Sequence, residues 1–203
     1  MKTILKYTLL LVFFTNCKAQ NNPQKTTKMK TFDIKTFNKN KIGNEYNFIT
    51  KDSTVVQQRK RQFGYYEIIK EKTSYFQIRK SYYENGNLKS TVKDFPNDFL
   101  VGLYKEYDEQ GNLIKETDYD APYKFTWEDI LKFIKERKLD MDAYGFEVTR
   151  SFGFGKQEDI TEEPFWAITY NKSEEDMLLG VIIIDGITGK IIKEFDEDYP
   201  LEE

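Results

Sequence analysis

The sequence predicts a mostly β protein of the α+β class, with an antiparallel β-meander of repeated hairpins followed by one helix on an antiparallel sheet. The pattern Tyr-x-Glu-x-Gly-Asn-Leu begins at Tyr82 and recurs 25 residues later at Tyr107. Short runs of strand-forming residues alternate with turn residues. One amphipathic helical pattern and four more strand-like runs follow residue 125. These observations divide the chain into a leader, a tether, the meander and the helix-on-sheet unit, at 1–17, 18–31, 32–121 and 122–203.

The first 17 residues have the features of an export signal. A basic start is followed by an apolar run at 7–14, which is far shorter than the ~20 residues of a membrane span. The next residues, Phe-Thr-Asn-Cys at 14–17, resemble the lipobox of bacterial lipoproteins, in which the cysteine is acylated and becomes the mature N-terminus. This resemblance implies lipidation of Cys17 and a location in the envelope of a Gram-negative bacterium, in the outer membrane or facing the periplasm.

The alternative for the leader is ordinary signal cleavage after Ala19, which would export the chain without an acyl anchor. Residues 18–31, which are polar and contain a single proline, are expected to form a flexible tether.

The meander is expected to begin at residue 32, where runs rich in β-branched and aromatic residues are bounded by turn residues. Alternation places Phe76, Ile78 and Tyr82 on one face, with Leu103 and Tyr107 at the equivalent positions of the next repeat. The opposite face is expected to be mostly exposed to solvent. The predicted strands are 45–50, 54–59, 65–71, 74–83, 88–95, 101–108 and 113–119.

The repeat also predicts two matching turns. Asn85-Gly86 lies between two strand runs and indicates a type I′ turn, which requires φ > 0 at both residues. Gln110 and Gly111 hold the equivalent places in the second copy. The positions that match at the offset of 25 residues are Lys80/Lys105, Tyr82/Tyr107, Glu84/Glu109, Gly86/Gly111, Asn87/Asn112 and Leu88/Leu113.

These two hairpins, over about residues 65–120, resemble the MORN-like repeats of bacterial proteins. In those repeats a tyrosine and an acidic residue precede Asn/Gln-Gly-Asn-Leu and a lysine. Families that carry the repeat are often described as antitoxin- or immunity-like, so the resemblance implies a binding role of that kind.

The C-terminal segment is expected to fold as a helix followed by four strands. Thr126 and Asp129 form a capping-box pattern, and apolar residues follow at helical spacing from Trp127. Gly186 and Gly189 are predicted to form the tight turn between the last two strands. The predicted strands are 146–152, 165–170, 178–185 and 190–195.

This segment, over about residues 124–197, resembles a PepSY-type domain. The likeness lies in Trp-Ala-Ile-Thr-Tyr at 166–170 and in Asp-Gly-Ile-Thr-Gly-Lys at 185–190. Such domains are thought to bind or restrain other proteins, notably proteases, in the envelope. No catalytic residue comes with the resemblance.

The composition excludes several kinds of chemistry. With no His and one Cys, the chain cannot build a Ser-His triad, a Cys/His zinc site or an intramolecular disulfide. The acidic runs at 158–163 and 174–176 lack the spacing of a calcium loop, so we expect no metal and no cofactor. Because His is absent, stability is expected to be nearly flat between about pH 6 and 8.

Charge is distributed unevenly along the chain. Residues 18–93 carry 17 basic and 6 acidic side chains, whereas residues 94–203 carry 12 basic and 28 acidic ones. The change of sign falls inside the repeats, which suits a protein with a complementary charge pattern and argues against nucleic acid. The candidate partner surface comprises Arg79, Lys80, Lys89, Lys93, Glu106, Asp108 and Glu109.

The sequence thus favours a non-catalytic lipoprotein that binds a protein partner in the envelope, and the resemblances imply that it acts as an inhibitor or immunity factor. One alternative is a structural or accessory lipoprotein whose repeats act as a spacer. A more distant alternative is a carboxylate-based hydrolase, which would require an assembled pair of carboxyl groups in a pocket.

Overall fold

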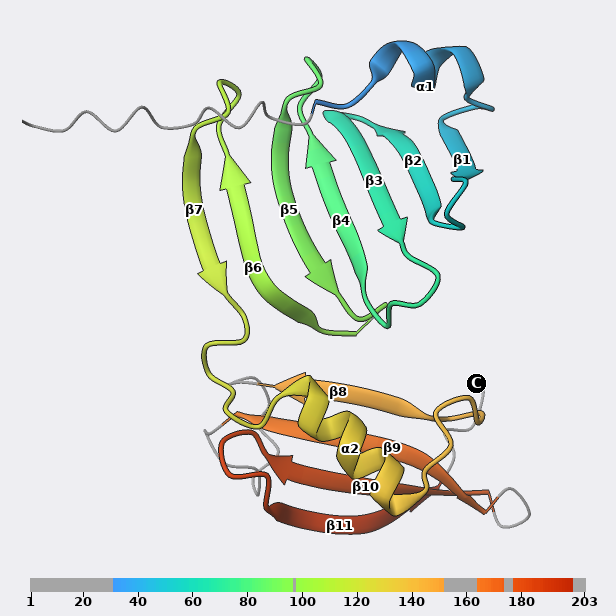
Figure 1. Cartoon of the computed structure of the whole chain (residues 1–203), viewed down its shortest axis with the longest axis vertical. Coiled ribbons are helices and arrows are strands. Elements are labelled where there is room, and N and C mark those ends of the chain that lie inside the picture. Colours follow the sequence, from blue (N-terminus) through green and yellow to red (C-terminus); the bar gives the residue numbers. More distant parts are fainter. Residues whose placement is uncertain (1–30, 97, 152–163, 174–176, 199–203) are drawn as a thin grey trace, which may run out of the picture.

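The computed structural model describes residues 31–96, 98–151, 164–173 and 177–198, and this part of the chain contains two antiparallel sheets and two helices. A seven-stranded sheet forms one end of the molecule, and a four-stranded sheet with a helix forms the other (Figure 1). The predicted fold class is confirmed. Neither helix in the described ranges is long and apolar enough to cross a membrane.

The larger sheet is a meander in which each strand pairs with its neighbours in the sequence. Prediction and structure differ most at the start of the fourth strand, where the predicted run began three residues early. The rings of Tyr75 and Phe76 pack on Trp127 instead, with centroids 5.7 and 5.4 Å away. The strands are β1 (Glu45–Ile49), β2 (Val55–Arg61), β3 (Gly64–Lys70), β4 (Gln77–Tyr82), β5 (Leu88–Asp94), β6 (Leu100–Tyr107) and β7 (Leu113–Asp118).

A short helix, α1 (Ile34–Asn40), precedes the sheet, and the prediction of strands alone from residue 32 was wrong there. The Asp33 side chain caps this helix by accepting a hydrogen bond from the Thr36 N–H at 2.9 Å. Phe37 is fully buried among Phe32, Tyr65, Tyr82 and Leu88 of the same cluster. Burial of this aromatic side chain therefore outweighs the strand propensity of Ile34 and Thr36.

The two repeated turns share one geometry, which is not type I′. In the first, the Tyr83 N–H donates to the Asn87 carbonyl at 2.9 Å and the Gly86 N–H donates to the Tyr83 carbonyl at 3.0 Å. This is a three-residue loop with the glycine in the left-handed region, at φ 86°. The second turn has the same two bonds between Asp108, Gly111 and Asn112, and Gly111 lies at φ 89°. Asn85 and Gln110 are not at positive φ.

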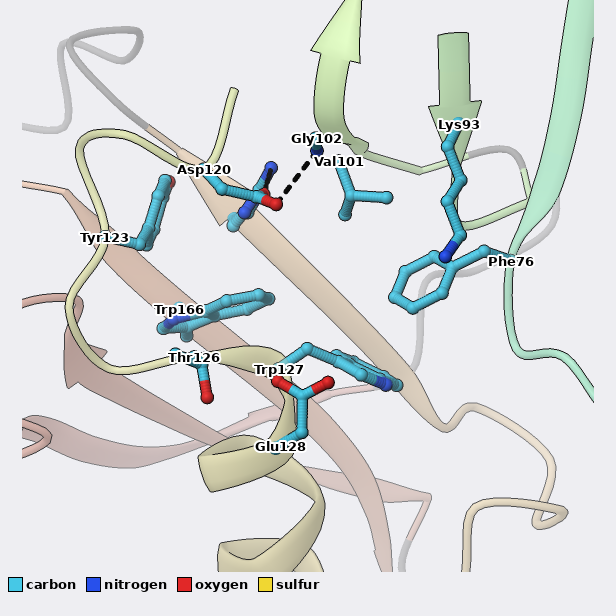
Figure 2. Close-up of a pocket in the computed structure, with 11 residues that line it drawn as sticks. Phe76, Lys93, Val101, Gly102, Asp120, Tyr123, Thr126, Trp127, Glu128 and Trp166 are labelled. Atoms are coloured by element: carbon cyan, nitrogen blue, oxygen red, sulfur yellow. Dashed lines mark hydrogen bonds and ion pairs between the residues drawn. The ribbon is translucent and has the colours of Figure 1, made fainter. Parts of the chain in front are cut away.

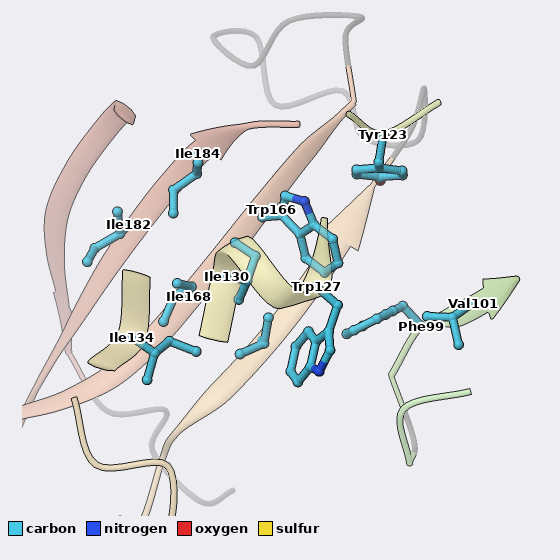
Figure 3. Close-up of a cluster of buried hydrophobic side chains, with 11 residues drawn as sticks. Phe99, Val101, Tyr123, Trp127, Ile130, Ile134, Trp166, Ile168, Ile182 and Ile184 are labelled. Atoms are coloured by element: carbon cyan, nitrogen blue, oxygen red, sulfur yellow. The ribbon is translucent and has the colours of Figure 1, made fainter. Parts of the chain in front are cut away.

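The C-terminal unit packs helix α2 (Trp127–Arg137) on a sheet with the order β11-β10-β9-β8. Thr126 and Asp129 form the reciprocal capping box that the sequence predicts. Ile130 and Ile134 of α2 face Ile168, Ile182 and Ile184 of the sheet (Figure 3). The strands are β8 (Glu147–Ser151), β9 (Phe165–Ser173), β10 (Leu178–Asp185) and β11 (Ile191–Asp198).

The two sheets meet through a shared aromatic core. Phe99, just before β6, lies beside Trp127 of α2 and Trp166 of β9, with ring centroids 6.0 and 5.4 Å away (Figure 3). The connection between the units also binds the β10–β11 turn, because the N–H groups of Lys124 and Phe125 both donate to the Gly186 carbonyl at 2.9 Å. The boundary predicted at 121/122 therefore falls within a continuous packed junction.

Candidate binding site at the junction of the two sheets

A hollow of about 250 Å³ lies where the larger sheet meets the C-terminal unit. Figure 2 shows Trp127 and Trp166 on one side of it, with Val101, Lys93 and Phe76 across from them. We call it the junction pocket. The residues that line it are Phe76, Lys93, Val101, Gly102, Asp120, Tyr123, Thr126, Trp127, Glu128, Arg150 and Trp166.

Local structure fixes the two tryptophans that form one wall of the junction pocket. Trp127 is the first residue of α2, so the capping box at Thr126 and Asp129 sets its position. The ring of Trp127 packs on Phe76 and Phe95, with centroids 5.4 and 5.3 Å away. Trp166 lies in β9, and its Nε1 donates to the Phe125 carbonyl at 2.9 Å. The aromatic wall is therefore held by both units rather than by one flexible loop.

Arg150 of β8 is the main cation in this wall, and its side chain is only 6% exposed. Its Nη2 lies 2.8 Å from Asp120 Oδ1 and also donates to the Leu100 carbonyl. The guanidinium lies over the rings of Tyr123 and Phe99, 4.6 and 5.2 Å from their centroids. One side chain thus ties β8 to β6 and to the connection between the units.

Both carboxylate oxygens of Asp120 already have a partner, so this side chain lacks the features of a free general base. Besides the ion pair with Arg150, its Oδ2 accepts a hydrogen bond from the Gly102 N–H at 2.9 Å (Figure 2). Burial raises the pKa of the nearby Tyr123 phenol to about 12, so this group is neutral at physiological pH. The pocket therefore presents apolar walls and a fixed ion pair rather than a nucleophile beside a base.

The rim of the junction pocket carries exposed charge of both signs. Lys93 is exposed, and its Nζ lies 4.8 Å from the centroid of the Phe76 ring. Glu128, the second residue of α2, is exposed on the opposite side. In the described ranges no group of three or more acidic, His or Cys side chains could hold a metal ion. The acidic runs at 158–163 and 174–176, and Cys17, lie outside the described residues.

The predicted turn residues all lie in turns. Asn85 and Gly86 connect β4 to β5, Gln110 and Gly111 connect β6 to β7, and Gly186 begins the turn between β10 and β11. Gly189 ends that last turn at φ 71°, and an added Cβ would lie 2.4 Å from the Phe125 ring. These residues fix the backbone and do not border the junction pocket.

The structure does not bring the predicted partner residues together into one surface. Arg79 and Lys80 are neighbours in β4, so their side chains lie on opposite faces of the sheet. Arg79 Nε is 2.9 Å from Asp94 Oδ1, and Asp94 is only 2% exposed, so the face that holds Arg79 is shielded from solvent at this point. On the other face, Lys80 Nζ lies 3.4 Å from Glu67 Oε1.

The second group of predicted partner residues is also largely paired. Glu106 Oε2 lies 3.6 Å from Lys115 Nζ, and Asp108 Oδ1 accepts the Asn112 N–H at 2.8 Å. Of the predicted set, Lys89, Lys93 and Glu109 remain exposed and form no ion pair with another described residue. Only Lys93 borders the junction pocket.

The sequence prediction did not identify Arg150, Phe99 or Tyr123 as site residues. Arg150 stands alone in a strand, without a charged neighbour in the sequence that would have marked it. Its partner Asp120 lies 30 residues earlier in the chain. No local pattern would have found this set, because it assembles only when β6, β8 and the connection between the units pack together.

Comparison with known proteins supports the repeats alone. A family model described as a MORN repeat variant matches residues 78–93 and 100–121, which correspond to the β4–β5 and β6–β7 hairpins. The prediction of MORN-like repeats is therefore confirmed. Neither a curated protein nor a solved structure matches the chain.

Proposed function

We propose that this protein is a non-catalytic lipoprotein of the cell envelope that binds a protein partner at the junction pocket. The junction pocket is the observation that carries the proposal. Its aromatic walls come from both units, and exposed charges of both signs stand at its rim. Aromatic pockets inside a polar rim are typical of the places where one anchoring side chain contributes most of the binding energy.

The size of the pocket favours a single side chain over a small-molecule ligand. At about 250 Å³ it is below the range of ~300–1,000 Å³ that is usual for drug-sized ligands. An aromatic or long aliphatic side chain of a partner would lie against Phe76 and the small exposed edges of Trp127 and Trp166, which are 8% and 1% exposed. Lys93 and Glu128 would then fix the orientation of the partner through complementary charges.

We infer that the C-terminal unit is PepSY-like and that the partner is restrained or inhibited on binding. The order of helix α2 followed by strands β8–β11 supports this inference. So does the location of the two characteristic segments, 166–170 within β9 and 185–190 at the β10–β11 turn. The MORN repeats add the association with antitoxin- and immunity-like proteins.

The proposal includes export, an acyl anchor on Cys17 and no reaction at the pocket. The short apolar run and the lipobox-like residues at 14–17 support the anchor. The pairing of Asp120 with both Arg150 and Gly102 supports a binding rather than a hydrolytic role. Nucleic acid is not the proposed partner, because the repeats carry charges of both signs.

A spacer function is the second candidate, and one observation favours it. The seven-stranded sheet lies between the first described residues and the C-terminal unit, and the aromatic core joins the two units into one packed body (Figure 1). Such an arrangement would hold the C-terminal unit at a fixed distance from an anchored N-terminus.

Crosslinking in intact cells separates the two functions. A photo-crosslinking residue at Lys93 or Glu128 is expected to give a defined protein adduct, identified by mass spectrometry. The same residue at Lys132, which is 75% exposed on α2 and outside the pocket, is the matched control. With the photo-crosslinking residue at Lys93, the charge reversal Glu128→Lys is expected to reduce adduct formation about tenfold without a change in thermal unfolding, and with it at Glu128, Lys93→Glu is expected to do the same.

A folded chain that is retained in the membrane but gives no rim-specific adduct would favour the spacer instead. Release of the wild-type chain from membranes, with no acyl group found on Cys17, would remove the anchor from the proposal.

A further inference from the structure

One end of the larger sheet combines exposed apolar side chains with exposed cations. We call it the turn end: it consists of α1 and the β2–β3, β4–β5 and β6–β7 turns, on the side away from the C-terminal unit (Figure 1). Phe63 in the β2–β3 turn is 74% exposed, and Ile42, just after α1, is 89% exposed. Ile42 belongs to this end because the Lys60 N–H, at the end of β2, donates to the Asn44 carbonyl at 2.8 Å.

Cations surround these apolar groups. Lys89 and Phe63 together border two shallow hollows, and Arg61 borders one of them. The Arg61 guanidinium lies 5.2 Å from the centroid of the Tyr66 ring, and Lys89 Nζ lies 5.5 Å from that of Tyr83. At the turn end, the exposed cations that form no ion pair with another described residue are Lys35, Lys39, Lys41, Arg61 and Lys89.

The acidic side chains at this end are fewer, and most are already engaged. Asp33 caps α1, and Asp108 accepts N–H groups of its own turn. Glu84 lies 3.6 Å from Lys60 Nζ. Glu45, which is bridged to Ile42, lies 2.7 Å from Arg59 Nη2, and Glu109 is exposed. The turn end therefore presents an excess of positive charge around Phe63 and Ile42.

The chain leads from this end toward the proposed anchor. The Phe32 N–H donates to the Gly86 carbonyl at 2.9 Å, which joins the first described residues to the β4–β5 turn. Fourteen residues, 18–31, separate Phe32 from Cys17, and they include four lysines and no acidic residue. A coil of that length has a root-mean-square span of about 20 Å. An acylated Cys17 would therefore bring the turn end closer to the bilayer than the rest of the fold.

We propose that the turn end rests on an anionic phospholipid surface, with Phe63 and Ile42 in the headgroup region and the surrounding cations near lipid phosphates. This proposal rests on the proposed lipid anchor and names the surface of the folded domain that meets the membrane. Basic residues beside a lipid anchor add electrostatic attraction to anionic headgroups, and exposed aromatic groups enter the interface. The cations surround a blunt end rather than line a groove, which suits a flat surface better than a nucleic-acid backbone.

The test uses the full acylated chain reconstituted in vesicles. Phe63→Trp provides a fluorophore at the turn end, while the native Trp127 and Trp166 are buried at the other end of the sheet. Tyr144→Trp is the matched control, because Tyr144 is 75% exposed in the C-terminal unit. In phosphatidylcholine vesicles with one quarter phosphatidylglycerol, brominated acyl chains are expected to quench the Phe63→Trp signal at least twofold more than the Tyr144→Trp signal.

The electrostatic part is tested by charge reversal on the same fluorophore background. Arg61→Glu combined with Lys89→Glu is expected to reduce the quenching at least twofold. Raising the salt concentration to 0.5 M is expected to do the same, whereas Lys132→Glu is expected to leave the quenching unchanged. Equal quenching at positions 63 and 144 in an anchored chain would overturn the turn-end proposal and leave the anchor standing. If mass spectrometry finds no acyl group, the anchor fails. Quenching at positions 63 and 144 is then compared for the unacylated chain, and stronger quenching at position 63 is required for the turn end to be the membrane-facing surface. A change in the Phe63→Trp fluorescence on addition of a DNA duplex, with no quenching in anionic vesicles, would also overturn the turn-end proposal.

Discussion

The hairpins β4–β5 and β6–β7 share the same repeated residues and the same turn geometry, yet their surroundings differ. In the first, Tyr82 and Leu88 are buried under α1. In the second, the equivalent Tyr107 is only partly buried and Leu113 is exposed. The comparison teaches that the repeat specifies a turn, while neighbouring strands and α1 determine which of its apolar residues become core.

The turns also differ in what their polar groups bind. In the first hairpin, the Tyr83 hydroxyl donates to the Tyr107 carbonyl and Asn87 Nδ2 donates to the Glu109 carbonyl, both at 2.8 Å. These bonds reach from one hairpin to the next. In the second, Asn112 Nδ2 donates to Asp108 Oδ2 within its own turn at 2.9 Å. The same asparagine therefore connects hairpins in one copy and closes its own turn in the other.

The largest expected difference between the copies is at the repeated tyrosine. Tyr82→Ala is expected to cost about 3–5 kcal/mol, because it empties a buried site and leaves Glu67 without its hydrogen bond of 2.9 Å from the Tyr82 hydroxyl. Tyr107→Ala, at a partly buried position, is expected to cost about 1–2 kcal/mol. Urea midpoints of both variants measure the difference, with Tyr82→Phe as a control for the hydroxyl alone. Equal losses would show that the two hairpins are buried alike.

The turn glycines give a smaller difference in the same direction. Valine at either position is strained by about 1–2 kcal/mol, because both backbones lie in the left-handed region. At Gly86 the added Cβ would also lie 3.2 Å from Ile34 Cδ1 and from the Phe32 carbonyl oxygen. We therefore expect Gly86→Val to cost about 3 kcal/mol and Gly111→Val about 1–2 kcal/mol. Calorimetric unfolding of both variants, with Gly→Ala at each site for comparison, tests this order.

The connection between the two hairpins adds a pH effect that the sequence did not predict. Asp94 lies beside the Arg79 guanidinium, whereas Asp98 lies near the carboxylate of Glu147. Burial, together with the like charge of Glu147, raises the pKa of Asp98 to about 7. An acid with a raised pKa in the folded state contributes stability that is fully present below its unfolded value of 3.8. That contribution is lost as the pH rises through 7.

Stability is therefore expected to fall between about pH 4 and 8, in contrast to the nearly flat profile between about pH 6 and 8 that the absence of His predicts. Asp98 is only partly buried, so solvent screening reduces the effect to about 1 kcal/mol, below the roughly 4 kcal/mol of an unscreened shift. Chemical denaturation at intervals of half a pH unit measures the slope. Asp98→Asn should flatten it, and an unchanged slope in that variant would assign the effect to another group.

The sequence predicted the elements whose signals are local. Strand ends follow the turn residues, and α2 follows the capping box at Thr126. Helix α1 was missed because its signal is short, and the helix depends on the burial of Phe37 under the folded sheet together with the Asp33 cap. The junction pocket could not be predicted, since Phe76, Trp127 and Arg150 are far apart in the chain and assemble only by packing between the units. The predicted partner surface grouped Arg79 with Lys80, which strand geometry separates.

The pairing of Asn112 with Asp108 has a consequence for how this sheet can change in length. Asp108 stands where the first copy has Tyr83, and it binds the asparagine that would otherwise reach toward a following hairpin. The second copy thus has the chemistry of a terminal member. A gene duplication that adds a hairpin would preserve the hydrogen bonds between neighbouring hairpins only if the new copy has a tyrosine at the position of Tyr83 and is inserted before β6. A copy added after β7 would lie beside Asn112, whose side chain already donates to Asp108 and does not reach the new hairpin.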